Sequence, residues 1–438
     1  MATPTFSAEK YVGLIDSVDF IRQNGKVRQV IGVVLESLGP NMAVGETCEI
    51  SYRRTAAPVL AEVVGFRDNK VLIMPLGDLA GIGAGSEVVS LGRPLQIGVT
   101  DELLGRVLDG LGHPMDGKGR IIADHRMPVI ARPPDPLSRS RIVSPLSLGI
   151  RAIDGLLTCG KGQRLGIFAG SGVGKSTILG MIARNTAADV NVIALIGERG
   201  KEVRDFIERD LGEQGLKRSV VIVSTSDQPA LVRIKAAFVA MTIAEFFRDQ
   251  GLDVMFMMDS VTRFAMAQRE VGLAIGEPTT TRGYTPSVFA LLPKLLERSG
   301  TSRTGTITGL YSVLVDGDDM NEPVADAVRS ILDGHVVLSR QLAAGNHYPA
   351  IDVLASVSRV MPDVVDANHL SAASAIRDIM ATYREAEDLI NIGAYVPGSN
   401  PRVDLALSKI ENIRTFLKQG ITEHAGYDQT LLQLMSVA

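Results

Sequence analysis

The chain has 438 residues, of which 45% are hydrophobic and 21% are charged, and its formal net charge is −4. A composition of this kind predicts two or three well-packed globular domains and excludes extended disorder. The mild negative charge argues against a general nucleic-acid-binding surface, although it leaves room for a local basic patch.

The N-terminal residues predict no secretory leader. Residues 1–16 lack a basic start followed by an apolar core, and no uncharged apolar run is long enough to span a bilayer. Cys48 and Cys159 are far apart and form no CxxC pattern, and the six histidines have no metal-ligand spacing. We therefore expect a cytoplasmic protein in a reducing compartment, which could still dock on a membrane assembly through partners.

The first predicted element, residues 1–25, is a short amphipathic segment. Such a segment either packs as a helix on the domain behind it or binds a partner, and both interpretations stay open. Its apolar side chains recur at helical spacing: Tyr11, Leu14, Ile15, Val18 and Ile21. In residues 26–93, short β-branched runs alternate with turn residues, which predicts a small β-barrel. These runs lie at 27–37, 46–52, 59–66 and 70–76.

Residues 94–362 predict an α/β domain. Two turn-rich connectors, at 105–119 and 131–141, lead into apolar runs separated by helical stretches. Near-continuous Val, Ile, Leu and Met runs indicate strands buried on both faces, hence a parallel sheet covered by helices. The runs lie at 164–169, 191–197, 219–225, 253–259 and 306–316. Residues 363–438 have helical periodicity and predict a helical C-terminal domain.

The stretch 164–177, RLGIFAGSGVGKST, predicts a phosphate-binding loop between a buried strand and a helix. Glycines let backbone N–H groups converge on an anion, Lys175 can reach the outer phosphates, and the Ser176 hydroxyl can ligate Mg²⁺. Ala169 replaces the first glycine of the strict pattern, which costs little if φ is negative there. An accidental GKS in a turn is the weaker alternative, because the flanking strand and helix are both in place. We expect ATP to contact Gly170, Ser171, Gly172, Val173, Gly174, Lys175, Ser176 and Thr177.

Three further side chains follow predicted strands. Asp259 ends one of them and is either a helix cap or a magnesium-binding carboxylate. Glu198, in GERGKE, either begins a charged surface helix or orients the water that attacks the γ-phosphate. Arg359 is either buried structurally or acts as an arginine finger, on its own subunit or on a neighbour.

With these motifs in place, the chain resembles the catalytic ATPase of type III protein export, the flagellum-specific branch, within the rotary F/V-type ATPase family. The resemblance covers nearly the whole length. It is carried by GRVLDGLGHPMDGKG, AGSGVGKST, GERGKEVRDFIE, DSVTRFAMAQREVGLAIGEP, GYTPSVFALLPKLLERSG, VLVDGDDMNEP, ILDGHVVLSR and HYPAIDVLASVSRV.

The resemblance implies a role for each candidate residue. Lys175 and Ser176 match the phosphate lysine and the magnesium hydroxyl, Asp259 matches the magnesium-associated aspartate, and Glu198 matches the water-activating glutamate. Arg199 and Arg263 match arginines near the phosphates. Tyr348 matches the aromatic residue that packs on adenine, and Tyr395 is expected to help close the base pocket. Arg359 matches the finger donated across the subunit boundary.

The resemblance also implies an architecture and partners. The expected fold has an N-terminal β-barrel, a RecA-like central domain with a parallel sheet and a helical C-terminal domain, assembled as a homohexamer. The expected partners are a peripheral regulator bound through the N-terminal segment, a central stalk protein, export chaperone–substrate complexes and the export gate at the membrane, but no nucleic acid. The expected location is cytoplasmic and peripheral, at the inner face of the cytoplasmic membrane.

These expectations predict an ATP-hydrolysing motor of the flagellar type III export apparatus, with the ATPase of a virulence-type secretion system as the alternative. A ring-shaped RNA helicase is a remote alternative, since it shares KGQR, the phosphate loop and the core. It would need an aromatic, basic barrel face, whereas the N-terminal part has few aromatic residues (Tyr11, Phe20, Tyr52 and Phe66). A non-catalytic ring subunit is disfavoured by the presence of both Glu198 and Lys175.

Overall fold

The computed structural model describes residues 24–438 except 52–56, 124, 316 and 318. The segment expected at 1–25 therefore lies almost wholly outside the described residues. The chain forms two compact units, Met1–Leu95 and Gln96–Ala438. The finer division of the second unit into residues 94–362 and 363–438 stays a prediction. None of the described helices is long and apolar enough to cross a membrane.

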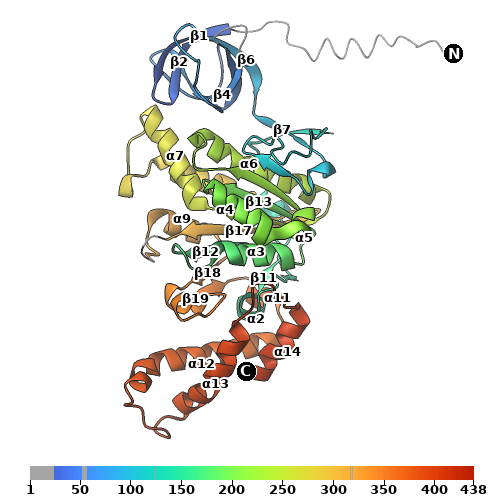
Figure 1. The fold of residues 1–438 in the computed structure, drawn as a ribbon, viewed down its shortest axis with the longest axis vertical. Coiled ribbons are helices and arrows are strands. Elements are labelled where there is room, and N and C mark those ends of the chain that lie inside the picture. Colours follow the sequence, from blue (N-terminus) through green and yellow to red (C-terminus); the bar gives the residue numbers. More distant parts are fainter. Residues whose placement is uncertain (1–23, 52–56, 124, 316, 318) are drawn as a thin grey trace, which may run out of the picture. The chain divides into compact units, whose positions relative to one another are not determined.

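The first unit is a closed barrel with the strand order β1-β2-β5-β4-β3-β6 (Figure 1). Alternate apolar side chains, such as Val27, Leu35 and Ile73, fill its interior. The predicted barrel is confirmed, with two corrections. The run at 27–37 is a hairpin and not one strand, because the chain turns at Gly32 with a φ of 57°. A sixth strand closes the barrel where the sequence predicted none. The strands are β1 Asn24–Ile31, β2 Val34–Leu38, β3 Glu46–Ser51, β4 Val59–Arg67, β5 Lys70–Pro75 and β6 Glu87–Pro94.

The second unit is built on a sheet with the order β19-β18-β12-β17-β15-β13-β14-β8, with β16 paired to β17. Its strands pair in parallel except for β16 and β19, which are antiparallel to their neighbours. The predicted parallel sheet is confirmed. Its strands are β8 Val107–Asp109, β12 Arg164–Ala169, β13 Val190–Ile196, β14 Ser219–Ser224, β15 Asp253–Asp259, β16 Gly300–Thr301, β17 Thr306–Leu314, β18 Gly334–Leu338 and β19 Ile351–Ser358. Short pairs of strands lie outside it: β7 Gln96–Val99 with β9 His125–Pro128, and β10 Pro145–Leu146 with β11 Cys159–Gly160.

Helices cover this sheet and continue into a helical C-terminal part, in which α12 packs along α13 (Figure 1). The helices of the sheet region are α2 Arg151–Leu156, α3 Lys175–Asn185, α4 Gly200–Asp205, α5 Gly212–Lys217, α6 Ala230–Asp249, α7 Val261–Ile275, α8 Pro286–Leu296, α9 Pro323–Ile331 and α10 Arg340–Ala344. Those of the C-terminal part are α11 Met361–Val364, α12 Ala367–Asn391, α13 Pro401–Leu417 and α14 Tyr427–Val437. The predicted fold class is thus confirmed.

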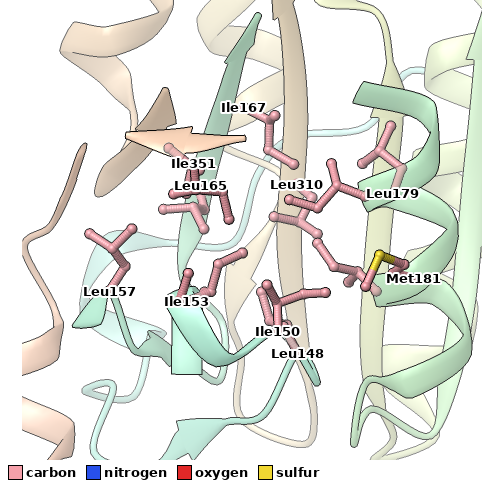
Figure 2. Close-up of a cluster of buried hydrophobic side chains, with 14 of the residues drawn as sticks. Leu148, Ile150, Ile153, Leu157, Leu165, Ile167, Leu179, Met181, Leu310 and Ile351 are labelled. Atoms are coloured by element: carbon pink, nitrogen blue, oxygen red, sulfur yellow. The ribbon is translucent and has the colours of Figure 1, made fainter. Parts of the chain in front are cut away.

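The core of the second unit holds the strand that carries the phosphate loop. Leu165 and Ile167 of β12 point into a buried cluster with Leu179 of α3, Leu310 of β17 and Ile351 of β19 (Figure 2). Burying side chains of this size contributes about 1.5–3 kcal/mol each. Both ends of β12 are therefore held on a well-packed support.

Candidate active site

The phosphate loop joins β12 to α3. Gly172 and Gly174 have φ angles of 80° and 92°, which residues with a side chain rarely adopt. Because α3 begins at Lys175, directly after Gly174, the unpaired N–H groups of its first turn lie at the loop. Ala169 is the last residue of β12 and does not have a positive φ, so alanine is tolerated there. The loop can therefore bind an anion.

Two carboxylates converge on Lys175 from neighbouring strands. Lys175 Nζ donates a hydrogen bond to Asp259 Oδ1 and lies 3.8 Å from Glu198 Oε1. Asp259 ends β15, and Glu198 follows β13, the neighbour of β15 in the sheet. Since the carboxyl ends of parallel strands share one edge, three residues from distant parts of the sequence meet beside the loop.

Arg263 packs next to this cluster from the first turn of α7. A Cβ built on Gly197 would lie 2.9 Å from Arg263 Cβ, so a glycine before Glu198 is needed for this approach. Within the described residues, Arg263 Nε and Glu198 Oε1 are both buried without a hydrogen-bond partner. Buried polar atoms of this kind are rare in native proteins and indicate a place for a polar ligand.

Glu198 is electrostatically unusual. Burial raises the pKa of this carboxyl to about 7, the nearby charge of Asp259 adds to the shift, and Lys175 opposes it. A carboxyl with a pKa near neutrality is suited to accept a proton at the pH of the cell. Ser312 of β17 stabilises the second carboxylate, because its Oγ donates a 2.7 Å hydrogen bond to Asp259 Oδ1.

The residues present fit a magnesium ion bound together with nucleotide phosphates. Among the described residues, no group of three or more His, Cys, Asp or Glu side chains could hold a metal by itself. Mg²⁺ usually takes only one or two protein oxygens and completes its shell with phosphates and water. Asp259 offers a buried carboxylate, and Ser176 offers a hydroxyl on the first turn of α3.

A cavity of about 420 Å³ adjoins the phosphate loop and suits a planar base. It lies toward the end of β18 and the loop before β19, on the other side of β12 from β13, the strand before Glu198. One wall holds Tyr348, whose ring lies next to Gly174: a Cβ built on that glycine would be 3.7 Å from the ring. The turn Gln419–Gly420–Ile421 after α13 also lines the cavity. This turn is tied to the first wall, since Gln419 N donates a 2.9 Å hydrogen bond to the Tyr348 carbonyl.

Three predicted residues lie apart from this group. The side chain of Arg199 is 79% exposed and pairs with Glu202 at 3.7 Å. Tyr395 does not line the base cavity: its hydroxyl donates to the Asn400 carbonyl and contacts Asp404 on the α12–α13 connection, so we do not assign it to the base pocket. Arg359 is exposed just after β19.

Arg359 lies at the end of the sheet opposite its own phosphate loop. β18 and β19 are antiparallel. At one end, Ile351 at the start of β19 pairs with Leu338 at the end of β18, and at the other end Ser358 at the end of β19 pairs with Gly334 at the start of β18. β18 runs parallel to β12, whose last residue, Ala169, pairs with Leu338. The eight residues of β19 therefore separate Tyr348 from Arg359 by about 25 Å.

Sequence reasoning missed two contributors to the site. Ser312 lies in the apolar run at 306–316, which the sequence analysis assigns only to the sheet, and its hydroxyl bonds Asp259 from the neighbouring strand. The turn at Gln419–Ile421 gave no signal, because its role depends on how the C-terminal helices return to the loop.

Comparison with known proteins agrees with this architecture. The nucleotide-binding domain of the ATP synthase alpha/beta family matches residues 149–358, and the β-barrel domain of the same family matches residues 27–92. The C-terminal domain of the T3SS ATPase EscN matches residues 365–436.

Individual relatives are similar over nearly the full length. The flagellum-specific ATP synthase of Bacillus subtilis (strain 168) is 54% identical, over 98% of both chains. The type 3 secretion system ATPase of Xanthomonas euvesicatoria is 52% identical, over 95% of this chain and 94% of the relative.

The same similarity holds for solved structures. The assembled ATPase EscN of the enteropathogenic E. coli type III secretion system aligns with a TM-score of 0.90 at 47% identity, over 94% of this chain and 99% of EscN. EscN in complex with its central stalk EscO aligns with a TM-score of 0.87. The chain belongs to the ATP synthase alpha/beta family, in the group that contains the flagellum-specific ATP synthases and the type 3 secretion system ATPases.

Proposed function

We propose that this chain is the ATP-hydrolysing motor of a type III protein export apparatus. The observation that carries the proposal is the convergence of Lys175, Glu198 and Asp259 beside a phosphate loop. Relatives of nearly equal identity are named for flagellar and for secretion-system ATPases, so the comparisons favour neither branch. We keep the flagellar apparatus as the first assignment and the virulence-type apparatus as the second.

In the proposed reaction, the loop N–H groups and Lys175 bind the β- and γ-phosphates and stabilise the charge that develops on them. Glu198 accepts a hydrogen bond from the attacking water and takes its proton at the carboxylate, for which a pKa of about 7 is well matched. Arg263 donates to the phosphate oxygens from the first turn of α7. Ser176 and Asp259 would hold Mg²⁺, which would supply charge neutralisation at the phosphates. Tyr348 packs on the adenine.

Arg359 acts in this proposal on the site of a neighbouring protomer. Its own phosphate loop lies at the other end of β12, which supports action across a boundary. An arginine finger of this kind can contribute about 10³–10⁵ in kcat. Assembly as a homohexamer with a central stalk follows the assembled EscN structures. The peripheral regulator, the chaperone–substrate complexes, the export gate and the membrane-peripheral location belong to the same proposal.

The test replaces Glu198 by Gln, which keeps the shape but cannot accept the proton. We expect steady-state hydrolysis to fall at least about 100-fold, while a fluorescent ATP analogue still binds. Glu208→Gln serves as the matched control, since Glu208 is exposed and pairs with Arg204 on the same helical stretch. Near-normal turnover of the Glu198 variant would contradict its assignment as the base.

A further inference from the structure

The backbone that carries Arg359 is fixed by residues at the start of the phosphate-loop strand. Arg359 N donates a 3.0 Å hydrogen bond to the Asp333 carbonyl, directly before β18. Gln163 Nε2 donates to the same carbonyl at 3.3 Å and to Ser358 Oγ at 3.1 Å. Ser358 Oγ in turn donates to the Thr158 carbonyl at 2.9 Å. Both residues of the Ser358–Arg359 pair are thus held by hydrogen bonds.

The side chain of Gln163 is held by burial and by hydrogen bonds at both ends of its amide. Its side chain is fully buried, and its Oε1 accepts a 2.9 Å hydrogen bond from Gly160 N. The amide therefore uses both its oxygen and its nitrogen, which fixes its orientation. Because a buried amide loses water on folding, each of these partners is costly to remove.

The strand end next to Arg359 is packed too tightly to move freely. A Cβ built on Gly334 would lie 2.6 Å from the Val357 carbonyl oxygen, so only glycine permits this approach of β18 to β19. Arg164 reinforces the same corner, since its Nε and Nη2 donate to the two carboxylate oxygens of Asp333 at 3.1 Å each. Such two-point pairs restrict geometry more than single hydrogen bonds do.

The Arg359 side chain contrasts with this rigid base. It is exposed, and among the described residues no carboxylate forms an ion pair with it. A long cation on a fixed backbone, with no ion-pair partner among the residues that the structure describes, is arranged to meet a group from outside.

We propose that Gln163 and Ser358 are positioning residues that hold Arg359 in place for catalysis on the neighbouring protomer. This inference rests on the proposed function, in which Arg359 acts across the subunit boundary. Gln163 immediately precedes β12, the strand that leads to the subunit's own phosphate loop. The same strand therefore supports the subunit's own site at one end and its contribution to the neighbour's site at the other.

The test mixes two inactive variants in one ring and asks whether ATP hydrolysis recovers. Lys175→Ala destroys a protomer's own site and keeps its finger, whereas Arg359→Ala does the reverse. We expect Gln163→Ala to lower kcat about 10–100-fold, as a small misplacement of a catalytic group does, with the KM for ATP within about twofold of wild type. Assembled with Lys175→Ala, it should recover activity. Assembled with Arg359→Ala, it should not, because every finger in that ring is defective.

The controls separate positioning from general damage. Asn191→Ala removes another buried amide, whose Nδ2 donates to the Ala183 carbonyl and to Ser219 Oγ. It should lower stability, but it should not share the complementation behaviour of Arg359→Ala. Ser358→Ala should behave as Gln163→Ala does, and Ser358→Thr, which keeps the hydroxyl, should restore kcat. Recovery of Gln163→Ala with Arg359→Ala, recovery with neither partner, or an unchanged kcat would each overturn the proposal. If Lys175→Ala and Arg359→Ala fail to complement each other, the action across the boundary itself is wrong.

Discussion

At the scale of single residues, Glu198 should make stability depend on pH in an unusual direction. Its pKa is raised to about 7 by burial and by Asp259, so in the folded state the neutral carboxyl is favoured. The stabilisation that comes with this proton is present below the ordinary pKa of 4.5 and is lost as the pH rises through about 7.

Glu198→Gln, which resembles the neutral carboxyl, should therefore stabilise the nucleotide-free protein by about 2–3 kcal/mol at pH 8 and by less than about 1 kcal/mol at pH 5. Urea unfolding at the two pH values measures this difference. Glu208→Gln, at an exposed position, is the control measured alongside it. A Glu198 variant that is less stable than wild type at pH 8 would mean that the charged carboxylate is favoured in the fold.

The positions of single residues also explain why part of the site could be predicted. Lys175, Glu198 and Asp259 each follow a strongly apolar strand, and a parallel sheet brings such strand ends to one edge. The surroundings of Arg199 and Tyr395 could not be predicted this way. Local pairing decides where these two side chains point: Glu202 attracts the first and Asp404 holds the second.

At the scale of elements, the sequence predicted the long buried strands and missed short or half-exposed ones. β18 alternates between buried and partly buried residues, and β8 has only three residues, so neither gives the continuous apolar run that marks β13 or β15. The first barrel run hid a hairpin, because a single glycine is a weak turn signal. Contacts made by segments far apart in the sequence, such as the turn after α13 with Tyr348, leave no local pattern at all.

The turn after α13 should control nucleotide affinity. Gln419 Oε1 accepts a hydrogen bond from Arg151 N, and its Nε2 donates to the Gly149 and Glu423 carbonyls. Gln419→Ala removes the partner of all three backbone groups, of which the buried Gly149 carbonyl costs about 1–3 kcal/mol when left unpaired, and it loosens one wall of the base cavity. We expect the KM for ATP to rise about tenfold, which corresponds to about 1.4 kcal/mol, with kcat within about threefold.

Steady-state kinetics with Gln429→Ala as a control measures this effect, since Gln429 is exposed on α14, outside the cavity lining. A loss in kcat at constant KM would instead assign the turn to the chemical step.

At the scale of the whole molecule, the proposed mechanism leaves one protomer by itself with an incomplete site. The phosphate loop, Glu198 and Asp259 lie at one end of the sheet, and Arg359 lies at the other. A closed ring solves this geometry, because each protomer then offers its loop to one neighbour and its arginine to the next. Catalysis should consequently depend on assembly even though every protomer can bind ATP.

Dilution of the wild-type protein should therefore lower the hydrolysis rate per protomer, by mass action on the ring. The rate should fall to the level of Arg359→Ala, whose rate per protomer should not change with concentration, because its site lacks the finger whether assembled or not. Hydrolysis assays over a range of protein concentrations, with the assembly state followed by light scattering, measure both curves. A wild-type rate per protomer that stays constant while the rings dissociate would show that a single protomer completes its own site, and Arg359 would then lose its place in the mechanism.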